Sequence, residues 1–203
     1  MYLVKTPGII QTLFAGLVWR IAKSKKVYLT FDDGPIPEAT PWILDLLHSR
    51  NIKATFFCVG ENVKKYPEIF QRILDEGHTV GNHTYNHLNA WKTKGEEYNR
   101  NIEKASEVID SKLFRPPYGK LSFSQLKSLK SKYEIIMWDV LSGDFDTSIT
   151  AQECFSNVKN NAQEGSIIVF HDSLKAIDKL KIVLPQVISY FEEQGIIMDK
   201  IDK

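Results

Sequence analysis

Two adjacent carboxylates lie near the start of the sequence, in the segment TFDDG that spans residues 30–34. Asp32 and Asp33 follow a short apolar run, and neighbouring side chains at the end of a strand can serve two different tasks. Because two carboxylates held this close repel each other, a bound cation beside them would be favourable. Asp-Gly-Pro is also strong turn chemistry. Taken alone, the segment fits either a simple turn or a site for acid–base or metal chemistry.

Histidines are concentrated in a second segment, GNHTYNH, which spans residues 81–87. His83 and His87 are four residues apart, a spacing that predicts both rings on one face of a helical turn and that is typical of paired metal ligands. With Asp33 they would form a set of two histidines and one carboxylate that leaves positions open for water and substrate. Two unrelated histidines are the alternative, but His78 is also near, so three of the five histidines lie within ten residues.

Three later segments carry further groups that could take part in acid–base chemistry. In FRPPYG two prolines fix the backbone, Arg115 can bind a carboxylate through two hydrogen bonds, and a rigid loop can direct a backbone N–H at a developing oxyanion. WDVLSGDF supplies Asp139 and Asp144, and VFHD ends the most apolar run at His171. Each segment alone has an ordinary structural explanation. Together, five successive strand ends carry ionisable groups.

The elements that must position these groups alternate along the chain. Short runs rich in β-branched and aromatic residues predict seven strands, at 26–31, 53–59, 78–81, 113–115, 134–138, 166–170 and 195–198. Helical patterns between them predict helices at 40–49, 67–76, 95–110, 122–131, 150–163 and 173–193. This alternation indicates an α/β protein with a mostly parallel sheet. A closed or nearly closed barrel and an open doubly wound sheet both fit, and the barrel predicts that reactive groups cluster at the C-terminal ends of the strands.

The amino-acid composition excludes several classes of protein. The 203 residues are 43% hydrophobic and 25% charged, and 26 basic against 25 acidic residues leave a net charge of +1. These values exclude a disordered chain, and the net charge predicts no field that would steer the protein to nucleic acid or an acidic membrane. Two cysteines, Cys58 and Cys154, are too few for a disulfide scaffold and match no metal-binding spacing.

The N-terminal segment, residues 6–19, carries no charge. Fourteen residues are too few to cross a bilayer, which takes about 20, and the run lacks the features of a signal peptide. We expect residues 1–25 to pack on a single domain formed by residues 26–203. This interpretation predicts a cytoplasmic protein, with secretion or membrane anchoring through residues 6–19 as the alternative.

At this point the motifs TFDDG, HTYNH, RPPYG, GDF and VFH, in this order, resemble the five motifs of the polysaccharide deacetylases, the family 4 carbohydrate esterases. The resemblance covers residues 27 to about 198. It implies a distorted (β/α)₇ barrel, so that residues 26–203 would form the catalytic domain. It also implies metal-dependent removal of acetyl groups from sugars, usually N-acetylglucosamine polymers such as peptidoglycan or chitin. The expected partner is an acetylated carbohydrate, with no nucleic acid, no membrane span and a monomeric chain.

The resemblance also implies roles for individual residues. Asp32 matches the general base, and Asp33 matches the carboxylate ligand of one divalent ion, expected to be zinc, with cobalt or another divalent ion as alternatives. The other residues that match family positions are His83 and His87 as metal ligands, Arg115 as the group that orients the base, Tyr118 as the source of the oxyanion-binding N–H, His171 as the general acid and Asp144 as its partner.

The fourth motif departs from the family pattern. Many members have Asp-Ser-x-Asp-Trp, where this chain has Leu141, Ser142, Gly143, Asp144 and Phe145. Neither change touches the proposed metal set, so the motif predicts an active enzyme and leaves open which acceptor sugar it takes.

Three other functions are consistent with parts of the pattern. A non-haem iron oxygenase also uses two histidines and one carboxylate, but that site explains neither Asp32 nor His171. A catalytically silent carbohydrate-binding protein would not need the complete set. An O-acetyl esterase, of the acetylxylan type, or an amidase acting on a small molecule would use the same fold and the same residues.

Overall fold

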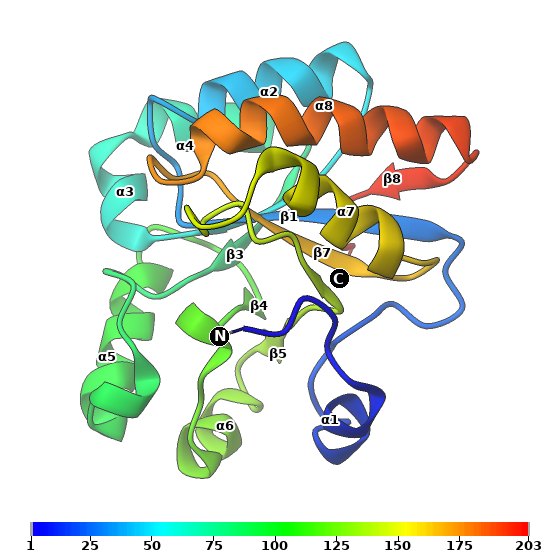
Figure 1. Ribbon diagram of the computed structural model, residues 1–203. Coiled ribbons are helices and arrows are strands. Elements are labelled where there is room, and N and C mark those ends of the chain that lie inside the picture. Colours follow the sequence, from blue (N-terminus) through cyan, green and yellow to red (C-terminus); the bar gives the residue numbers. More distant parts are fainter. Residues whose placement is uncertain (1, 203) are drawn as a thin grey trace.

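The sheet is built outward from its longest strand, β1 (Lys26–Asp32). The structure, a computed structural model that describes residues 2–202, places the strands in the order β5-β4-β3-β2-β1-β7-β6, with β8 paired to β1. All these pairings are parallel. The strands curl into the distorted (β/α)₇ barrel that the sequence predicts, rather than an open doubly wound sheet (Figure 1).

The remaining elements alternate around this sheet. The other strands are β2 (Thr55–Cys58), β3 (Thr79–Asn82), β4 (Leu113–Phe114), β5 (Glu134–Ile135), β6 (Val140–Leu141), β7 (Ile167–His171) and β8 (Ile197–Asp199). The helices are α1 (Gly8–Leu13), α2 (Thr40–Ser49), α3 (Gly60–Lys65), α4 (Pro67–Asp75), α5 (Gly95–Ser106), α6 (Phe123–Leu129), α7 (Ala151–Asn161) and α8 (Ile177–Glu193). None of them is long and apolar enough to span a membrane within residues 2–202.

Most predicted elements are present, and four differ. The strand predicted at 134–138 ends at residue 135, and a further two-residue strand, β6, follows it at residues 140–141. The short helices α1 and α3 were not predicted. Elements of two to six residues are too short to show a periodicity of their own, which is why the sequence pattern does not separate them.

Alternation along β1 divides the interior into two parts. Val27, Leu29 and Phe31 belong to the main core between the sheet and the helices, whereas Tyr28 packs in a separate cluster. Thr30, on the same face as Tyr28, accepts a hydrogen bond from Arg115. Since successive strand residues point to opposite faces, the odd-numbered positions hold the helices and the even-numbered positions face the barrel interior.

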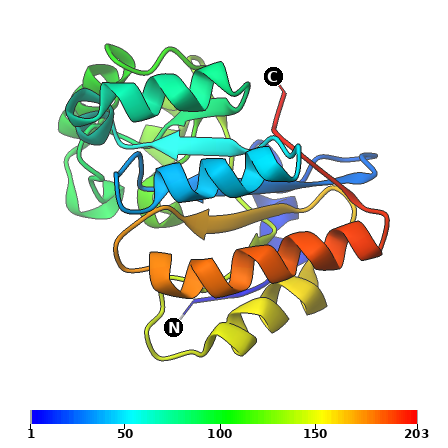
Figure 2. The ribbon, with the colours of Figure 1, turned by 90° about the horizontal axis from the view of Figure 1, so that it is seen from above.

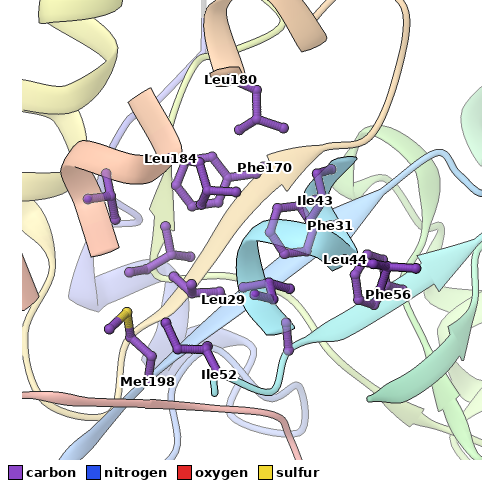
Figure 3. Close-up of a cluster of buried hydrophobic side chains, with 14 of the residues drawn as sticks. Leu29, Phe31, Ile43, Leu44, Ile52, Phe56, Phe170, Leu180, Leu184 and Met198 are labelled. Carbon is purple, nitrogen blue, oxygen red and sulfur yellow. The ribbon is translucent and has the colours of Figure 1, made fainter. Parts of the chain in front are cut away.

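The main core lies under α2 and α8. Phe31 stacks on Phe56 of β2 and Phe170 of β7 at ring-centroid separations of 5.0 and 5.9 Å. Leu180 and Leu184 of α8 cover this stack (Figure 3). Figure 2 shows α2 and α8 lying above the strands with their axes along them. This packing fixes β1 and β7, the two neighbouring strands that end at Asp32 and His171.

The N-terminal segment lies in the gap between β5 and β6, the two ends of the strand order. Val18 forms a parallel bridge with Ile136, and Lys5 forms an antiparallel bridge with Val140. The Lys5 ammonium also binds Asp139 at 2.6 Å. Asp139, one of the acidic residues considered for chemistry, therefore serves as an anchor for this segment.

Candidate active site

The carboxyl ends of β1 and β7 bring two reactive side chains together. The parallel register pairs Asp32 with His171. On the other side of β1, β2 and β3 lead to the loop that carries His83 and His87, and β4 leads to Arg115. The predicted groups from four strand ends therefore meet at the C-terminal edge of the sheet.

A strained turn holds Asp33 beside Asp32. Asp33 has a backbone φ of 91°, a conformation that L-residues adopt rarely. The next amide, from Gly34, donates to Asp172 at 2.9 Å, and the Thr40 hydroxyl donates to the same carboxylate at 2.6 Å. A side chain at Gly34 would collide with Asp172, because its Cβ would lie 1.8 Å from Oδ2. Burial raises the pKa of Asp172 to about 8.

The two histidines lie on a loop, and the predicted helical turn is wrong. Thr84 and His87 have positive φ values of 66° and 58°, which interrupt any right-handed helix. The Asn82 side chain accepts the Thr84 amide at 2.8 Å, a local turn that competes with helix formation. The first amide of α3, from Gly60, donates to the Thr84 carbonyl at 3.0 Å, so the loop is fixed from both ends.

Asp33, His83 and His87 nevertheless converge as a metal-ligand set would. One ligand atom from each residue lies within 4.8 Å of the others. The Asp33 Oδ1 atom is 3.2 Å from Nε2 of His87 and 3.8 Å from Nε2 of His83. Three donors at these separations can close around one divalent ion with little movement.

The protonation states of the set also suit a cation. Nδ1 of His83 is 2.8 Å from the Arg115 carbonyl, so it donates its proton there and leaves Nε2 free toward Asp33. Burial lowers the pKa of His83 to about 4, which keeps the ring neutral, as a ligand must be. Burial acts to raise the pKa of Asp33, but the hydrogen bond from His87 and the charges of the nearby histidines lower it below its usual range.

Arg115 is a fully buried cation that holds Asp32. Its Nη1 atom donates to Asp32 Oδ1 at 2.6 Å and to the Thr30 hydroxyl at 2.8 Å. Its other nitrogens donate to two backbone carbonyls, and its guanidinium lies 4.0 Å from the centre of the Phe57 ring. Burial lowers the pKa of Arg115 against the opposing effect of Asp32, and an arginine stays protonated regardless. Asp32 thus has a permanent counter-charge.

A second buried pair joins Asp144 to His171. Nδ1 of His171 is 2.8 Å from one Asp144 oxygen, and the His171 amide donates to the other at 2.6 Å. The Ser142 hydroxyl and the Phe145 amide also donate to Asp144. Burial acts to lower the pKa of His171, but Asp144 outweighs it and raises the value to about 9. His171 is therefore charged at neutral pH and can donate a proton.

The loop after β4 places Tyr118 beside a candidate metal ligand. Tyr118 has a φ of 61°, and its ring packs edge-on against His87 at 4.8 Å between centroids. The next amide, from Gly119, donates to the Pro116 carbonyl at 3.0 Å, so the loop is held in a tight turn. A backbone N–H on a loop fixed in this way suits the role of an oxyanion-binding group.

A cavity of about 610 Å³ is lined by six of the predicted residues, Asp32, Asp33, His83, His87, Tyr118 and His171, while Arg115 and Asp144 bind Asp32 and His171 from outside its wall. Leu141 and Phe145, the departures in the fourth motif, are also in its wall, and Phe145 packs edge-on against His171 at 5.0 Å. The wall also includes residues that the sequence did not single out, five of them from the N-terminal segment: Tyr2, Leu3, Thr6, Ile10 and Trp19. The absence of charge over residues 6–19 was the one available signal for part of this set.

Sequence comparisons identify relatives of this chain. A family model for polysaccharide deacetylases matches residues 20–133. Two peptidoglycan-N-acetylglucosamine deacetylases of Bacillus cereus are 40% identical over 173 residues and 32% identical over 187 residues. The first alignment covers 79% of this chain and 62% of that protein, and the second covers 88% of both. A chitooligosaccharide deacetylase of Azorhizobium caulinodans is 33% identical over 167 residues, which is 77% of this chain and 79% of that protein.

Solved structures agree with these relatives. A peptidoglycan N-acetylglucosamine deacetylase in complex with 4-naphthalen-1-yl-N-oxidanyl-benzamide matches 97% of this chain and 95% of its own, with a TM-score of 0.88 and 35% identity. A family 4 pseudoenzyme from Bacillus anthracis also matches, with a TM-score of 0.78 and 26% identity over 90% of this chain and 66% of its own. The fold is therefore compatible with both active and inactive proteins, and the side chains of the site must decide between them.

Proposed function

This chain belongs to the polysaccharide deacetylase family, and from that premise we propose that it hydrolyses the N-acetyl group of an N-acetylglucosamine-containing oligo- or polysaccharide and releases acetate. Peptidoglycan and chitooligosaccharides are the glycans that the names of its relatives point to. The observation that carries the proposal is the convergence of a three-ligand set with two separate buried ion pairs in one cavity.

Asp33, His83 and His87 are the residues that would hold a divalent cation. The neutral His83 ring and the ionised Asp33 suit that task, and the set leaves room for water and substrate in the cavity. When bound, such an ion, zinc first among the candidates, would supply Lewis-acid chemistry to a water molecule and an acetyl carbonyl. The family is metal-dependent, and the donor set in this structure fits that requirement.

Asp32 is placed to act as the general base. One oxygen of its carboxylate accepts a hydrogen bond from Arg115 at 2.6 Å, which fixes its orientation and places a positive charge beside it. It takes a proton from the water that attacks the acetyl carbonyl carbon. The two adjacent carboxylates therefore have different roles: Asp33 would hold the cation, and Asp32 accepts the proton.

His171 completes the reaction from the other side. As the carbonyl becomes tetrahedral, the Tyr118 N–H donates to its negative oxygen. The C–N bond then breaks, and the charged His171 gives its proton to the departing amine. The products are acetate and a free amino sugar, so one water is consumed and each proton is accounted for.

The complete set argues against a silent binding protein. A protein that only held a glycan would gain nothing from a buried arginine bound to one carboxylate and a charged histidine bound to another, since burying ion pairs carries a desolvation penalty. The same residues would serve an O-acetyl esterase, so the substrate must be tested directly.

The decisive experiment measures acetate release and metal content on the same sample. We expect acetate from peptidoglycan fragments or chitooligosaccharides, little from acetylated xylan, and about one divalent ion per chain. In the double variant His83→Ala/His87→Ala both should be lost, while His48→Ala, an exposed histidine of α2, should retain both. Acetate from xylan alone would assign an O-acetyl esterase, and full metal occupancy in the double variant would remove the ligand assignment.

A further inference from the structure

The near-zero net charge hides a strong asymmetry along the chain. Residues 1–31 and 111–133 contain eleven of the 26 basic residues and none of the 25 acidic ones. The rest of the chain therefore has ten more acidic than basic residues. An overall charge of +1 predicts no directing field, but a distribution of this kind produces one side that attracts anions.

The two acid-free segments lie against each other. The Phe14 ring stacks on Phe123 of α6 at 6.2 Å between centroids. A Cβ placed on Gly16 would lie 2.0 Å from the Lys130 ammonium. In Figure 1, α1 and α6 both lie below the sheet, on the side away from α2 and α8. Carboxylates of the rest of the chain are paired with Lys5, Lys26, Arg115 and Lys132 of these segments. The asymmetry in space therefore comes from other basic residues, which include the exposed Lys127 and Lys130 of α6 and its C-terminal end.

Helix α1 exposes apolar side chains to water, which is energetically unfavourable. None of its six residues is buried. Ile9 and Leu13, one helical turn apart, are 71% and 72% exposed. A helix this short gains almost no stability by itself, so an apolar helix without a buried face indicates a surface that is covered by something else.

Helix α6 continues the same surface. Phe123 is 80% exposed, the highest value among the large apolar side chains of residues 2–202. Lys127, one turn further along, and Lys130 are also exposed. Trp91 is 67% exposed nearby, with the Lys120 ammonium 4.8 Å from its ring and its indole N–H donated to the Leu121 carbonyl. We call this surface, made by Ile9, Leu13, Phe14, Trp91, Phe123, Lys120, Lys127 and Lys130, the α1–α6 face.

We propose that the α1–α6 face docks the protein on the surface of a bilayer that contains anionic lipids. Aliphatic and aromatic side chains surrounded by lysines, with no acidic residue in either segment, match the interfacial pattern of proteins that lie on membranes without spanning them. The lysines would bind lipid phosphates while Ile9, Leu13 and Phe123 enter the upper part of the acyl layer. No helix needs to cross the bilayer, in agreement with the length and composition of the described helices.

The charge pattern favours a membrane over the other occupants of such a face. A second copy docked through the same surface would bring two acid-free, basic segments together, which is unfavourable. A polyanionic glycan would satisfy the lysines but would leave the aliphatic side chains in water. A lipid surface satisfies both.

Docking would also orient the active site. Ile10 of α1 and Lys120 line the catalytic cavity. Lys120 belongs to the α1–α6 face, and Ile10 follows Ile9, which also belongs to it. A membrane bound here would lie beside the cavity, so the enzyme would act on glycan close to the lipid surface. The docking itself does not depend on the proposed reaction.

Cosedimentation with vesicles tests the docking. We expect the full chain to bind vesicles of phosphatidylcholine mixed with phosphatidylglycerol, more strongly as the phosphatidylglycerol fraction rises and less strongly as salt rises. The double variant Leu13→Glu/Phe123→Glu should lower the partition coefficient between vesicles and solution by at least about tenfold. The matched control is Ile182→Glu, a 54% exposed residue of α8 outside the face, which should bind like the wild type. Thermal melting of each variant verifies that it is folded.

A second pair of variants tests the charges without touching apolar residues. Lys127→Glu/Lys130→Glu should abolish the preference for phosphatidylglycerol, and Lys64→Glu/Lys65→Glu on α3 should not. Acetate release from a soluble oligosaccharide should be unchanged in all these variants, which separates docking from catalysis. The proposal is overturned if no vesicle composition binds the wild type, or if both face variants bind as well as their controls. It is also overturned if sedimentation velocity shows a dimer that Leu13→Glu/Phe123→Glu dissociates in the absence of vesicle binding.

Discussion

The site contains two buried carboxylate–cation pairs that differ in one respect: one has a cation that never titrates, and the other has a cation that does. Arg115 is fully buried and donates to Asp32, to Thr30 and to two carbonyls. His171 is 16% exposed at its side chain, faces the cavity, and depends on Asp144 for its charge. We propose that the first pair orients a proton acceptor and that the second creates a proton donor.

This difference explains how one cavity can contain a base and an acid at the same pH. A base must stay ionised, so its partner should be permanently charged. A general acid must lose its proton and regain it in each cycle. It therefore needs a partner that favours its protonated form and a pKa that still lets the proton leave. A carboxylate–cation pair thus acts as a base where the carboxylate faces the substrate and as an acid where the cation faces it.

Removing the acid is expected to have the largest effect on the rate. His171→Ala should lower activity by at least about 10²-fold, the usual minimum for a general acid, because it removes the charged group proposed to protonate the amine. Its metal content should be unchanged, because His171 is not in the ligand set. Activity above half the wild-type value would mean that the amine is protonated by something else.

Substitutions of Arg115, the permanent cation, should change the unfolding free energy and the activity by different relative amounts. Arg115→Met leaves Asp32 buried without a partner and should cost about 3–5 kcal/mol of unfolding free energy, measured in urea. Arg115→Lys keeps the charge but loses the planar fork, so its stability loss should be smaller while activity still falls by about ten- to a hundredfold.

The matched control for that pair is Arg50→Lys. Arg50 binds Glu192 at 2.9 Å on the exposed surface, where such pairs contribute little. Its stability and activity should remain at the wild-type level. Wild-type turnover in Arg115→Lys would show that the arginine holds the structure without orienting the base.

The smallest expected effect is a displacement of the pH profile. With the pKa of His171 at about 9, kcat/KM of the wild type should fall on the alkaline side as pH approaches that value. In Asp144→Asn the pKa should return toward about 6.5, so this limb should move to lower pH. An alkaline limb that does not move, together with normal turnover, would separate the two residues.

The same pair contributes to stability with a definite sign. The folded-state pKa of His171 is raised, so the stabilisation is complete below the unfolded value of about 6.5. It is lost as pH rises through about 9. The difference in unfolding free energy between wild type and Asp144→Asn should therefore shrink across that window, as urea titrations at several pH values would show.

The five motifs indicated the family and the side chains that meet in the cavity, and the resemblance to that family implied the barrel. Asp32, Asp33, His83 and His171 follow strands whose parallel order was predictable from the alternation of elements. The conformation of the backbone between these residues was not predictable. The spacing of His83 and His87 predicts a helical turn, but the Asn82 side chain and two positive φ values make a loop instead.

The contact between the N-terminal segment and the cavity could not be predicted from the sequence, for a different reason. Residues 1–25 were expected to pack on the domain, but their contact with the site depends on pairing between segments more than one hundred residues apart, as in Lys5 with Asp139. Such pairing leaves no periodic signal in either segment. The exposed face of α1 shows the same limit, since its uncharged residues indicate a buried segment when read alone.

The central claim is that two neighbouring carboxylates have separate tasks, and one comparison tests it most directly. Metal content and acetate release should be measured together in Asp32→Asn and in Asp33→Asn. The account predicts that Asp32→Asn keeps its divalent ion and loses at least about 10²-fold of activity, whereas Asp33→Asn loses both. If Asp32→Asn empties the site while Asp33→Asn retains the ion, the assignment of base and ligand is contradicted.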